Sequence, residues 1–217
     1  MYQPPHFRED RLDVQHAMIR AHSFGALVTL GRDGLEASHI PFVLDETASP
    51  LGTLRGHLSR ANGQWKQLDT EREALIIFQG TQTYITPSWY PLKAETGKVV
   101  PTWNYVIVHA YGRPRVIEDG PWLAQNVSDL TSLHEGSRAE PWAVSDAPDE
   151  FIAGLLKGIV GIEIEISRIE GKWKASQNRP EADQAGVVAG LSGQHDEASQ
   201  AMAKVVAERG AIGKRTS

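Results

Sequence analysis

Residues 24–44 read FGALVTLGRDGLEASHIPFVL, and this stretch decides which kind of fold the chain can adopt. Phe24 to Leu30 has the composition of a strand, and Leu35 to Leu44 alternates between side-chain types and is rich in residues that favour strands. Between them, Gly31-Arg32-Asp33-Gly34 forms a turn signal, because Asp-Gly tolerates the positive φ angles of a tight hairpin. The stretch therefore predicts an antiparallel β-hairpin.

Further strands follow this hairpin along the chain, separated mostly by short turns. The pattern predicts strands at Thr53–Leu58, Ala74–Gly80, Tyr84–Ile85 and Thr102–Val116, and a closing hairpin made of Ile159–Ile169 and Trp173–Ser176 around Glu170-Gly171-Lys172. Closely spaced strands of this kind are typical of an antiparallel sheet that curls into a barrel. No strand leads into a Gly-rich helix start, which excludes a Rossmann domain and a P-loop.

Helices are predicted outside the barrel and at the C-terminus. They cover Asp10–Ala21, a single turn within Asn62–Leu68 with Asn62 as its N-cap, Pro121–Glu135, Asp149–Leu156, Glu181–Leu191, and Asp196–Arg209 with Gly210 as its C-cap. We expect residues 1–195 to form one domain, followed by a C-terminal helix and a disordered tail in residues 196–217, with disorder from Ala211 onward. The fold class is mainly β with α additions.

Composition narrows the possible functions. The 217 residues include no cysteine, which excludes disulfides, thiolate metal sites and thiol nucleophiles, and the eight histidines lack the spacing of metal ligands. We therefore predict no metal site. The net charge of -5 and the absence of a basic run weigh against nucleic acid as a partner. No apolar run is long enough to span a membrane, and a cytoplasmic location is expected.

One segment has the composition of a phosphate site. Leu54 to Trp65 ends a strand and enters the short helix with His57, Ser59, Arg60 and Asn62. A guanidinium, a hydroxyl and free backbone N–H groups together suit a phosphate. The alternative is structural, because histidines in strands are more often buried in the core than bound to ligands, and Arg55 and His57 lie on one face that could simply be solvated.

Three more segments place hydroxyls and amides beside indoles, which suits a flat, partly apolar ligand. They are Gln82–Tyr90, Val100–His109 and Gly171–Arg179. Each indole can equally serve packing, and Trp65 and Trp122 are expected to anchor their helices in the core. Because all four segments fall at strand ends of one predicted barrel, we favour a shared ligand site.

These segments resemble those of the PaiB-type family of FMN-binding negative transcriptional regulators. The resemblance lies in Gly-His-Leu-Ser-Arg-Ala-Asn from Gly56, Tyr-Ile-Thr-Pro-Ser-Trp-Tyr from Tyr84, Val-Pro-Thr-Trp-Asn-Tyr-Val from Val100 and Lys-Trp-Lys-Ala-Ser-Gln-Asn-Arg from Lys172. It also includes Met1–Phe7 and Gly158–Glu163, and it extends in order from Met1 to about Leu191.

The resemblance implies an FMN-binding split β-barrel similar to pyridoxamine-phosphate oxidases, with FMN as cofactor at the interface of a homodimer. It implies that Ser59, Arg60 and Asn62 hold the FMN phosphate and that Thr86, Ser88, Thr102 and Asn104 lie near the ribityl chain and ring edge. It further implies that Trp89 or Trp103 walls the flavin ring, that Lys174 or Arg60 lies near its pyrimidine edge, and that His57 is a candidate proton donor.

Two classes of function remain open. The family name implies a regulator with DNA as a partner, although the acidic charge and the lack of a helix-turn-helix pattern speak against DNA. The alternative is an FMN-dependent oxidoreductase or flavin reductase that acts on a small molecule, in which the cofactor supplies the redox chemistry. The sequence leaves the catalytic residues, the substrate and the electron donor open.

Overall fold

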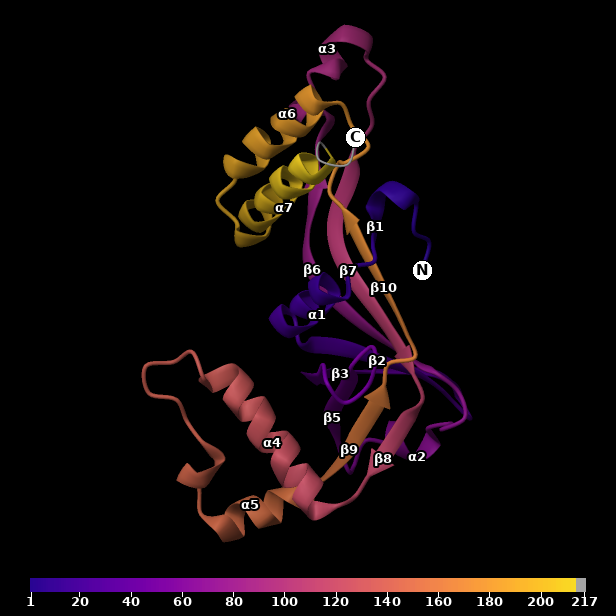
Figure 1. Cartoon of the computed structure of the whole chain (residues 1–217), viewed down its shortest axis with the longest axis vertical. Coiled ribbons are helices and arrows are strands. Elements are labelled where there is room, and N and C mark those ends of the chain that lie inside the picture. Colours follow the sequence, from indigo (N-terminus) through magenta and orange to yellow (C-terminus); the bar gives the residue numbers. More distant parts are fainter. Residues whose placement is uncertain (214–217) are drawn as a thin grey trace. The chain divides into compact units, whose positions relative to one another are not determined.

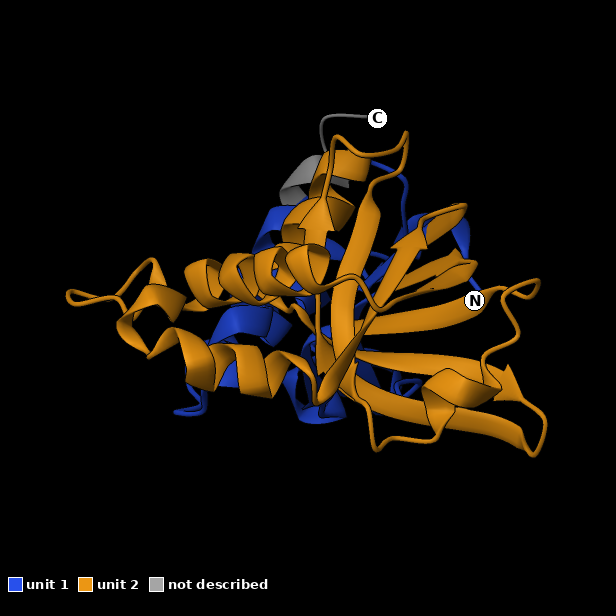
Figure 2. Ribbon diagram, turned by 90° about the horizontal axis from the view of Figure 1, so that it is seen from below, with its two compact units in different colours: residues 1–11, 79–108, 170–217 blue, residues 12–78, 109–169 orange. Residues whose placement is uncertain are grey.

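The computed structural model describes residues 1–213 and divides into two compact units (Figure 2). Unit 1 contains residues 1–11, residues 79–108 and the chain from residue 170 onward, whereas unit 2 contains residues 12–78 and 109–169. The strands β6 (Ala74–Ile85), β7 (Thr102–Gly112) and β10 (Arg168–Lys174) contribute residues to both. The units are therefore interleaved along the chain.

Unit 2 is built on antiparallel strands. In one sheet, β2 (Phe24–Gly31) lies between β3 (Gly34–Pro41) and the beginning of β6, with Leu27 opposite both Ser38 and Ile76. The other sheet has the order β4 (Val43–Asp45), β5 (Thr53–Ser59), β9 (Ile159–Glu165), β8 (Pro114–Ile117). One face of the first sheet is buried through Leu27, Ile76 and Phe78, as the period of two along a strand requires.

Helical segments complete unit 2. They are α1 (Leu12–Ala21), α2 (Gln64–Gln67), α4 (Gly120–Glu135), η3 (Val144–Asp146) and α5 (Asp149–Leu156). Of these, α1, α2, α4 and α5 are labelled in Figure 1. The side chain of Asp119 accepts a hydrogen bond from the backbone N–H of Trp122, at 2.9 Å, and Pro121 occupies the first turn of α4. These N-terminal signals explain why the long helix begins here.

Helix α4 packs against the second sheet at a position where the strand has no side chain. Gly161 of β9 lies beneath the indole of Trp122, and a Cβ at Gly161 would overlap this ring. The indole Nε1 donates to Glu163 at 3.3 Å, and Asp129, two turns along the helix, pairs with Arg55 of β5 at 2.9 Å. Trp122 therefore packs α4 onto the sheet as predicted, although its side chain is half-buried and not part of the core.

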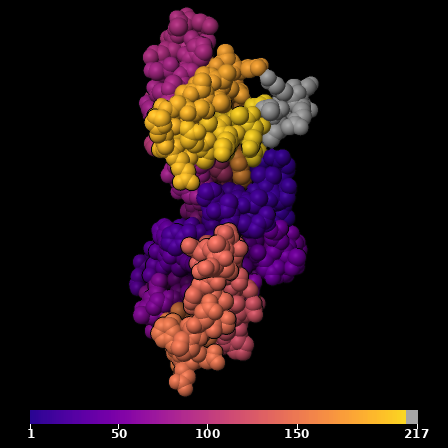
Figure 3. Space-filling model, turned by 90° about the vertical axis from the view of Figure 1, so that its left-hand side faces the viewer, coloured from indigo at the N-terminus to yellow at the C-terminus, as the bar shows by residue number. Residues whose placement is uncertain are grey.

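Unit 1 contains β1 (Arg8–Glu9), β10, β7 and β6 in that spatial order. Its helices are η1 (Pro5–Phe7), η2 (Pro87–Trp89), α3 (Leu92–Thr96), α6 (Glu181–Ser192) and α7 (Glu197–Gly213). Helices α6 and α7 lie side by side (Figures 1 and 3) and bury Val187, Leu191 and Met202 in an apolar core. Glu9 is buried between Arg11 and Arg209, and these two guanidinium groups lower the pKa of its carboxyl to about 2 despite the opposing effect of burial.

Several predicted strand boundaries are wrong. The two strands expected at Ala74–Gly80 and Tyr84–Ile85 form one strand, β6. The strand expected at Leu35–Leu44 is divided into β3 and β4 at buried Phe42, and the strand expected at Thr102–Val116 is divided into β7 and β8 beside Gly112, where the backbone of Glu165 leaves no room for a Cβ.

The expected closing hairpin is also wrong. Residues Glu170–Lys172 continue β10 in extended form, because Gly171 and Lys172 pair with Glu9 and Arg8 of β1. Strand β9 pairs instead with β5 and β8.

The predicted helix end at Gly210 is wrong as well, because α7 continues to Gly213. The disorder expected from Ala211 stays a prediction: the structure assigns residues 211–213 to α7, and residues 214–217 lie outside the described part of the chain. Within residues 1–213, no helix has the length and apolar character to cross a bilayer.

We predict that Gly161→Ala lowers the free energy of unfolding by about 1–3 kcal/mol, because the new methyl group overpacks the contact with Trp122. Urea denaturation measures this change. Gly154→Ala is the control, since no heavy atom lies within 4 Å of a Cβ at this helical position, and this variant should be neutral or more stable. Equal stability of the two variants would contradict the prediction.

Candidate functional site

Three of the predicted site residues, His57, Ser59 and Asn62, line one open groove of unit 2. The groove has a volume of about 550 Å³. Its other lining residues come from β3, β5, α5 and the start of β9 and are Ser38, His39, Ile40, Pro41, Leu58, Leu155, Gly158 and Ile159. Sites for small molecules commonly measure about 300–1,000 Å³ and combine apolar walls with a few polar groups. The groove has both properties.

The turn that follows β5 is fixed by its own polar side chains. Asn62 donates from Nδ2 to Ser38 Oγ at 2.9 Å, and its Oδ1 accepts from the backbone N–H of Gln64 at 2.9 Å. The buried amide of Gln64 donates to backbone oxygens of β2 and β3, and the backbone N–H of Arg60 donates to Gly158 at 2.8 Å. Gly63 is the N-cap residue of α2, one position after the predicted Asn62, although the Asn62 side chain does bond the backbone there. These bonds preform this side of the groove.

His57 adds an uncharged imidazole to the groove. Its Nδ1 lies 3.3 Å from Nδ2 of Asn126 on α4. Burial lowers the pKa of His57 below its usual value, because desolvation disfavours the charged ring. At neutral pH the side chain is therefore a neutral hydrogen-bonding group.

Arg60 has its guanidinium in a neighbouring pocket of about 500 Å³, lined by Leu123, Ala153, Leu156 and other residues of α4 and α5. Nε donates to the carbonyl oxygen of Lys157 at 3.1 Å, Nη2 donates to that of Ile159 at 3.2 Å, and Nη1 pairs with Glu118. The structure thus separates the Arg60 guanidinium from the groove that His57, Ser59 and Asn62 share.

Another three predicted residues, Thr102, Asn104 and Lys174, line a small pocket of unit 1, with a volume of about 100 Å³. The remaining lining residues are Phe7, Val100, Pro101, Ser176, Asn178 and Arg179. Lys174 donates from Nζ to the backbone oxygen of Trp103 at 2.6 Å and to Thr102 Oγ1. Burial lowers the pKa of Lys174, and the positive charges of Lys172 and Arg179 lower it further.

Asn104 gives this small pocket an unused acceptor. The side chain is 1% exposed, and its Nδ2 donates to Ser176 Oγ at 2.9 Å. Its Oδ1 is buried and accepts no hydrogen bond. Buried polar atoms are nearly always paired, so an unpaired one beside an ammonium group suits a ligand that offers a donor next to an acceptor.

The other predicted residues lie apart from both cavities. Thr86 caps η2 by accepting from the backbone N–H of Ser88, and Ser88 Oγ accepts from Lys93. The indole of Trp89 covers Gly190 of α6, where a Cβ would overlap the ring. Trp103 is 53% exposed and contacts Tyr84, with a distance of 6.2 Å between the ring centroids.

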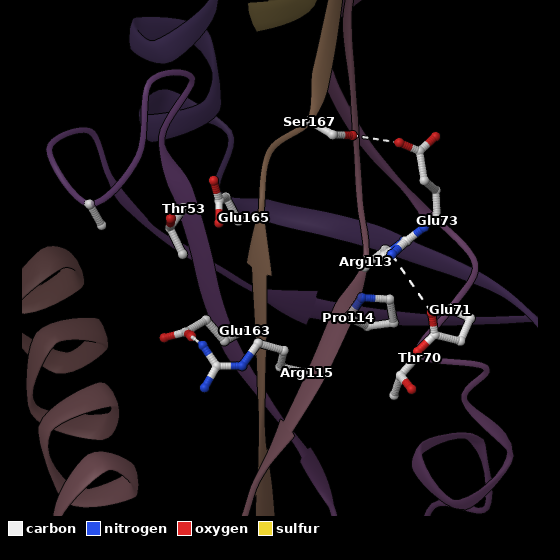
Figure 4. A pocket seen from close by; sticks show the side chains of 11 residues that line it. Thr53, Thr70, Glu71, Glu73, Arg113, Pro114, Arg115, Glu163, Glu165 and Ser167 are labelled. Atoms are coloured by element: carbon white, nitrogen blue, oxygen red, sulfur yellow. Dashed lines mark hydrogen bonds and ion pairs between the residues drawn. The ribbon is translucent and has the colours of Figure 1, made fainter.

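A third cavity in unit 2 contains none of the predicted residues. It has a volume of about 790 Å³ and is lined by charged side chains of β8 and β9 and of the chain before β6 (Figure 4). Arg115 pairs with Glu163 at 2.8 Å, Arg113 pairs with Glu71 at 3.7 Å, and Ser167 donates to Glu73. Since these charges are paired with one another, the cavity is a weaker candidate than the groove.

The contribution of β3 to the groove is not apparent from the sequence. Ser38 and His39 lie on a strand with a recognisable alternation, but the β5 and α5 residues that line the groove with them are distant in the sequence. The role of Asn126 is not apparent from the sequence either, because Asn126 is a single amide within a predicted helix. The one sequence feature that points to Asn126 is its spacing. It lies one turn after Trp122 and almost one turn before Asp129, so it shares the packed face of α4 with them.

Comparison of the sequence with known proteins gives consistent matches. Residues 1–168 match a family described as "Putative FMN-binding domain". An uncharacterized protein of Aspergillus fumigatus is 36% identical, over 93% of this chain and 95% of that protein. The protease synthase and sporulation protein PAI 2 of Bacillus subtilis is 29% identical, over 96% of this chain and 98% of that protein.

Solved structures with low sequence identity share the fold. A conserved hypothetical protein of Mycobacterium tuberculosis aligns with a TM-score of 0.59 at 12% identity, over 83% of this chain and 95% of that chain. The flavocytochrome Anf3 of Azotobacter vinelandii aligns with a TM-score of 0.56 at 11% identity, over 77% and 69%. These likenesses, with the antiparallel sheets, confirm the predicted split-barrel fold.

We predict that His57 makes the protein less stable as the pH falls from 7 to 5. Its folded pKa lies below the unfolded value of about 6.5, so in this range the unfolded chain binds more protons and the free energy of unfolding falls with the pH. His57→Gln should reduce this slope. Urea denaturation at a series of pH values measures it, and an unchanged slope in the variant would contradict the assignment.

Proposed function

The chain belongs to the FMN-binding domain family, as its PaiB-type motifs predict, and on that premise we propose that the groove of unit 2 binds FMN. The carrying observation is that Ser38, Ser59, His57 and Asn62 gather polar groups on one groove with apolar walls. FMN offers the complementary chemistry, since its phosphate and hydroxyls accept hydrogen bonds and its ring is flat and partly apolar. The residues present therefore fit the cofactor.

In this proposal Ser59 and Asn62 contact the phosphate end of the cofactor. Their hydroxyl and amide groups lie at the end of β5 and in the turn after it, where Ser59 Oγ already accepts from the backbone N–H of Ala61 at 3.3 Å. Arg60 is left out of this contact, because its guanidinium pairs with Glu118 in the neighbouring pocket. Hydrogen bonds from a preformed turn position an anion at little entropic cost.

We also propose that the small pocket of unit 1 binds a polar group that offers a donor next to an acceptor, through Asn104 and Lys174. The unpaired Oδ1 of Asn104 would accept from the donor of such a group, and the Lys174 ammonium would donate to its acceptor. Thr102 holds the ammonium in place. Thr86, Ser88 and Trp89 are left out of this proposal, because η2 and α6 already engage their side chains.

When bound, FMN supplies electron transfer, and the chain contributes binding, orientation and exclusion of water. We favour the regulatory role that the PaiB resemblance implies, with the flavin as ligand. The net charge of -5 makes a protein partner a better fit than DNA. Bleaching of the bound flavin by NAD(P)H would instead favour the alternative, an FMN-dependent oxidoreductase or flavin reductase.

A homodimer is supported by the outer face of the β6-β2-β3 sheet in unit 2. The side chains of β2 on this face are apolar, and Phe24 is 64% exposed. Strand β3 adds Ala37 and Leu35, which is 79% exposed, and β6 adds Leu75 and Ile77. His39 of β3, opposite Ala26, adds a polar side chain to this otherwise apolar face, and exposed apolar surface of this extent marks an interaction site. We propose that a second copy of the chain covers this face.

We predict that the protein binds FMN and that Asn62→Ala weakens binding about 10-fold or more, because a hydrogen bond to a charged group contributes about 1.5–3 kcal/mol. Quenching of flavin fluorescence on titration measures the affinity. Riboflavin should be less affected, since it has no phosphate. Gln125→Ala, which removes an exposed amide of α4, is the control. Absence of FMN uptake by the unmodified protein would refute the proposed function.

The proposed dimer gives a further prediction. Leu35→Glu should convert the dimer into a monomer, because it places charge in the apolar face, and sedimentation equilibrium measures the mass. Leu133→Glu is the matched control, since Leu133 is 41% exposed on α4, outside that sheet. A monomeric unmodified protein, or a dimeric Leu35→Glu variant, would contradict the assignment.

A further inference from the structure

Behind the groove, one buried amide is directed at an imidazole. Asn126 of α4 is completely buried, and its Nδ2 lies 3.3 Å from Nδ1 of His57. Its Oδ1 is buried without a hydrogen-bond partner, so the contact with His57 is the amide's one side-chain hydrogen bond among the described residues. Burial of a polar side chain costs free energy unless hydrogen bonds compensate it, so this one contact is the compensation available to the amide.

The contact between Asn126 and His57 determines which nitrogen of the neutral imidazole carries the proton. In a neutral imidazole one nitrogen carries the proton and the other accepts, and the bond made by one nitrogen fixes the state of the other. When Asn126 donates to Nδ1, the proton must reside on Nε2. The opposite orientation of the amide would put the proton on Nδ1 and turn Nε2 into an acceptor.

The charged groups around His57 are engaged elsewhere. Arg55, two residues earlier on the same face of β5, pairs with Asp129 of α4. Glu163 of β9 accepts from Trp122 and pairs with Arg115. From α5 and the start of β9, the groove receives the apolar side chains of Leu155 and Ile159. Within residues 1–213, no carboxylate forms a hydrogen bond or ion pair with the His57 ring, which leaves the Asn126 amide as its polar partner.

We propose that Asn126 is a positioning residue for the groove, because it holds His57 as the Nε2–H tautomer and so presents an uncharged donor to an acceptor oxygen of the bound ligand. This inference rests on the proposed function, since it concerns the same groove. It adds a selection rule: the groove favours a ligand with an acceptor oxygen, phosphate or carbonyl, opposite His57. A ligand that offers a donor at this point is disfavoured.

The tautomer itself can be measured without a ligand. In the full-length protein labelled with ¹⁵N-histidine, the His57 ring at neutral pH should show an unprotonated Nδ1 and a protonated Nε2. Asn126→Asp should reverse this state and raise the fraction of imidazolium, because a carboxylate accepts from Nδ1–H. A protonated Nδ1 in the unmodified protein would overturn the proposal, whatever the outcome of FMN binding.

Binding then tests the consequence. Asn126→Leu, which keeps the volume of the side chain and removes the donor, should weaken FMN about 5- to 10-fold, the loss expected for one hydrogen bond to the ligand held in place. Asp129→Asn is the matched control on the same face of α4 and should leave the tautomer and the affinity unchanged. Thermal denaturation of each variant shows that it is folded.

A comparison of ligands identifies the oxygen. If His57 donates to the phosphate, Asn126→Leu loses affinity for FMN but not for riboflavin; if it donates to the ring or ribityl chain, both ligands lose affinity equally. Either pattern supports the proposal. Unchanged affinity for both ligands, in a folded Asn126→Leu protein whose tautomer has changed, would overturn it. Absence of FMN binding by the unmodified protein would refute the proposed function and leave the tautomer result standing.

Discussion

The contact between Trp122 and Gly161 determines how α4 lies on the second sheet of unit 2. Because Gly161 has no Cβ, the indole comes directly onto the strand, and the next two turns of the helix approach β5 closely. Trp122, Asn126 and Asp129 recur at intervals of four and three residues, the spacing that keeps side chains on one helix face. The same packing therefore brings Asp129 to Arg55 and Asn126 to His57. One side of the groove depends on a glycine that does not itself line it.

The groove of unit 2 and the small pocket of unit 1 differ in the charge of their lining residues, and they therefore suit different ligand groups. Among the described residues, no carboxylate, lysine or arginine lines the groove, and burial lowers the pKa of its His57 imidazole. The small pocket of unit 1 has two positive charges, Lys174 and Arg179, in its lining and no carboxylate among the lining residues. The neutral donors on the preformed turn select a ligand by the positions of its acceptor atoms. The ammonium and the unpaired amide oxygen of the small pocket suit a polar group that has an acceptor next to a donor.

Similarity to solved structures shows that the fold by itself does not determine the function of this protein. Proteins with 11–12% identity share the architecture over most of their length, although their side chains differ almost everywhere. A split barrel is therefore compatible with many kinds of binding site, and the function depends on the chemical groups that line its cavities. In this chain those groups are concentrated where β3, the end of β5 and α5 meet.

The sequence by itself determined the class of fold, the hairpin at Phe24–Pro41 and the segment that supplies His57, Ser59 and Asn62, because alternation, turn chemistry and local motifs are properties of neighbouring residues. It could not determine where long strands break, since the division at Phe42 and beside Gly112 depends on what packs there from distant parts of the chain. Nor could it separate Arg60 from Asn62, two residues apart, because only the carbonyl groups of Lys157 and Ile159 and the carboxylate of Glu118 draw the guanidinium into another pocket. The partnership of Asn126 with His57 likewise exists only in the tertiary structure, where helix packing brings together residues 69 positions apart.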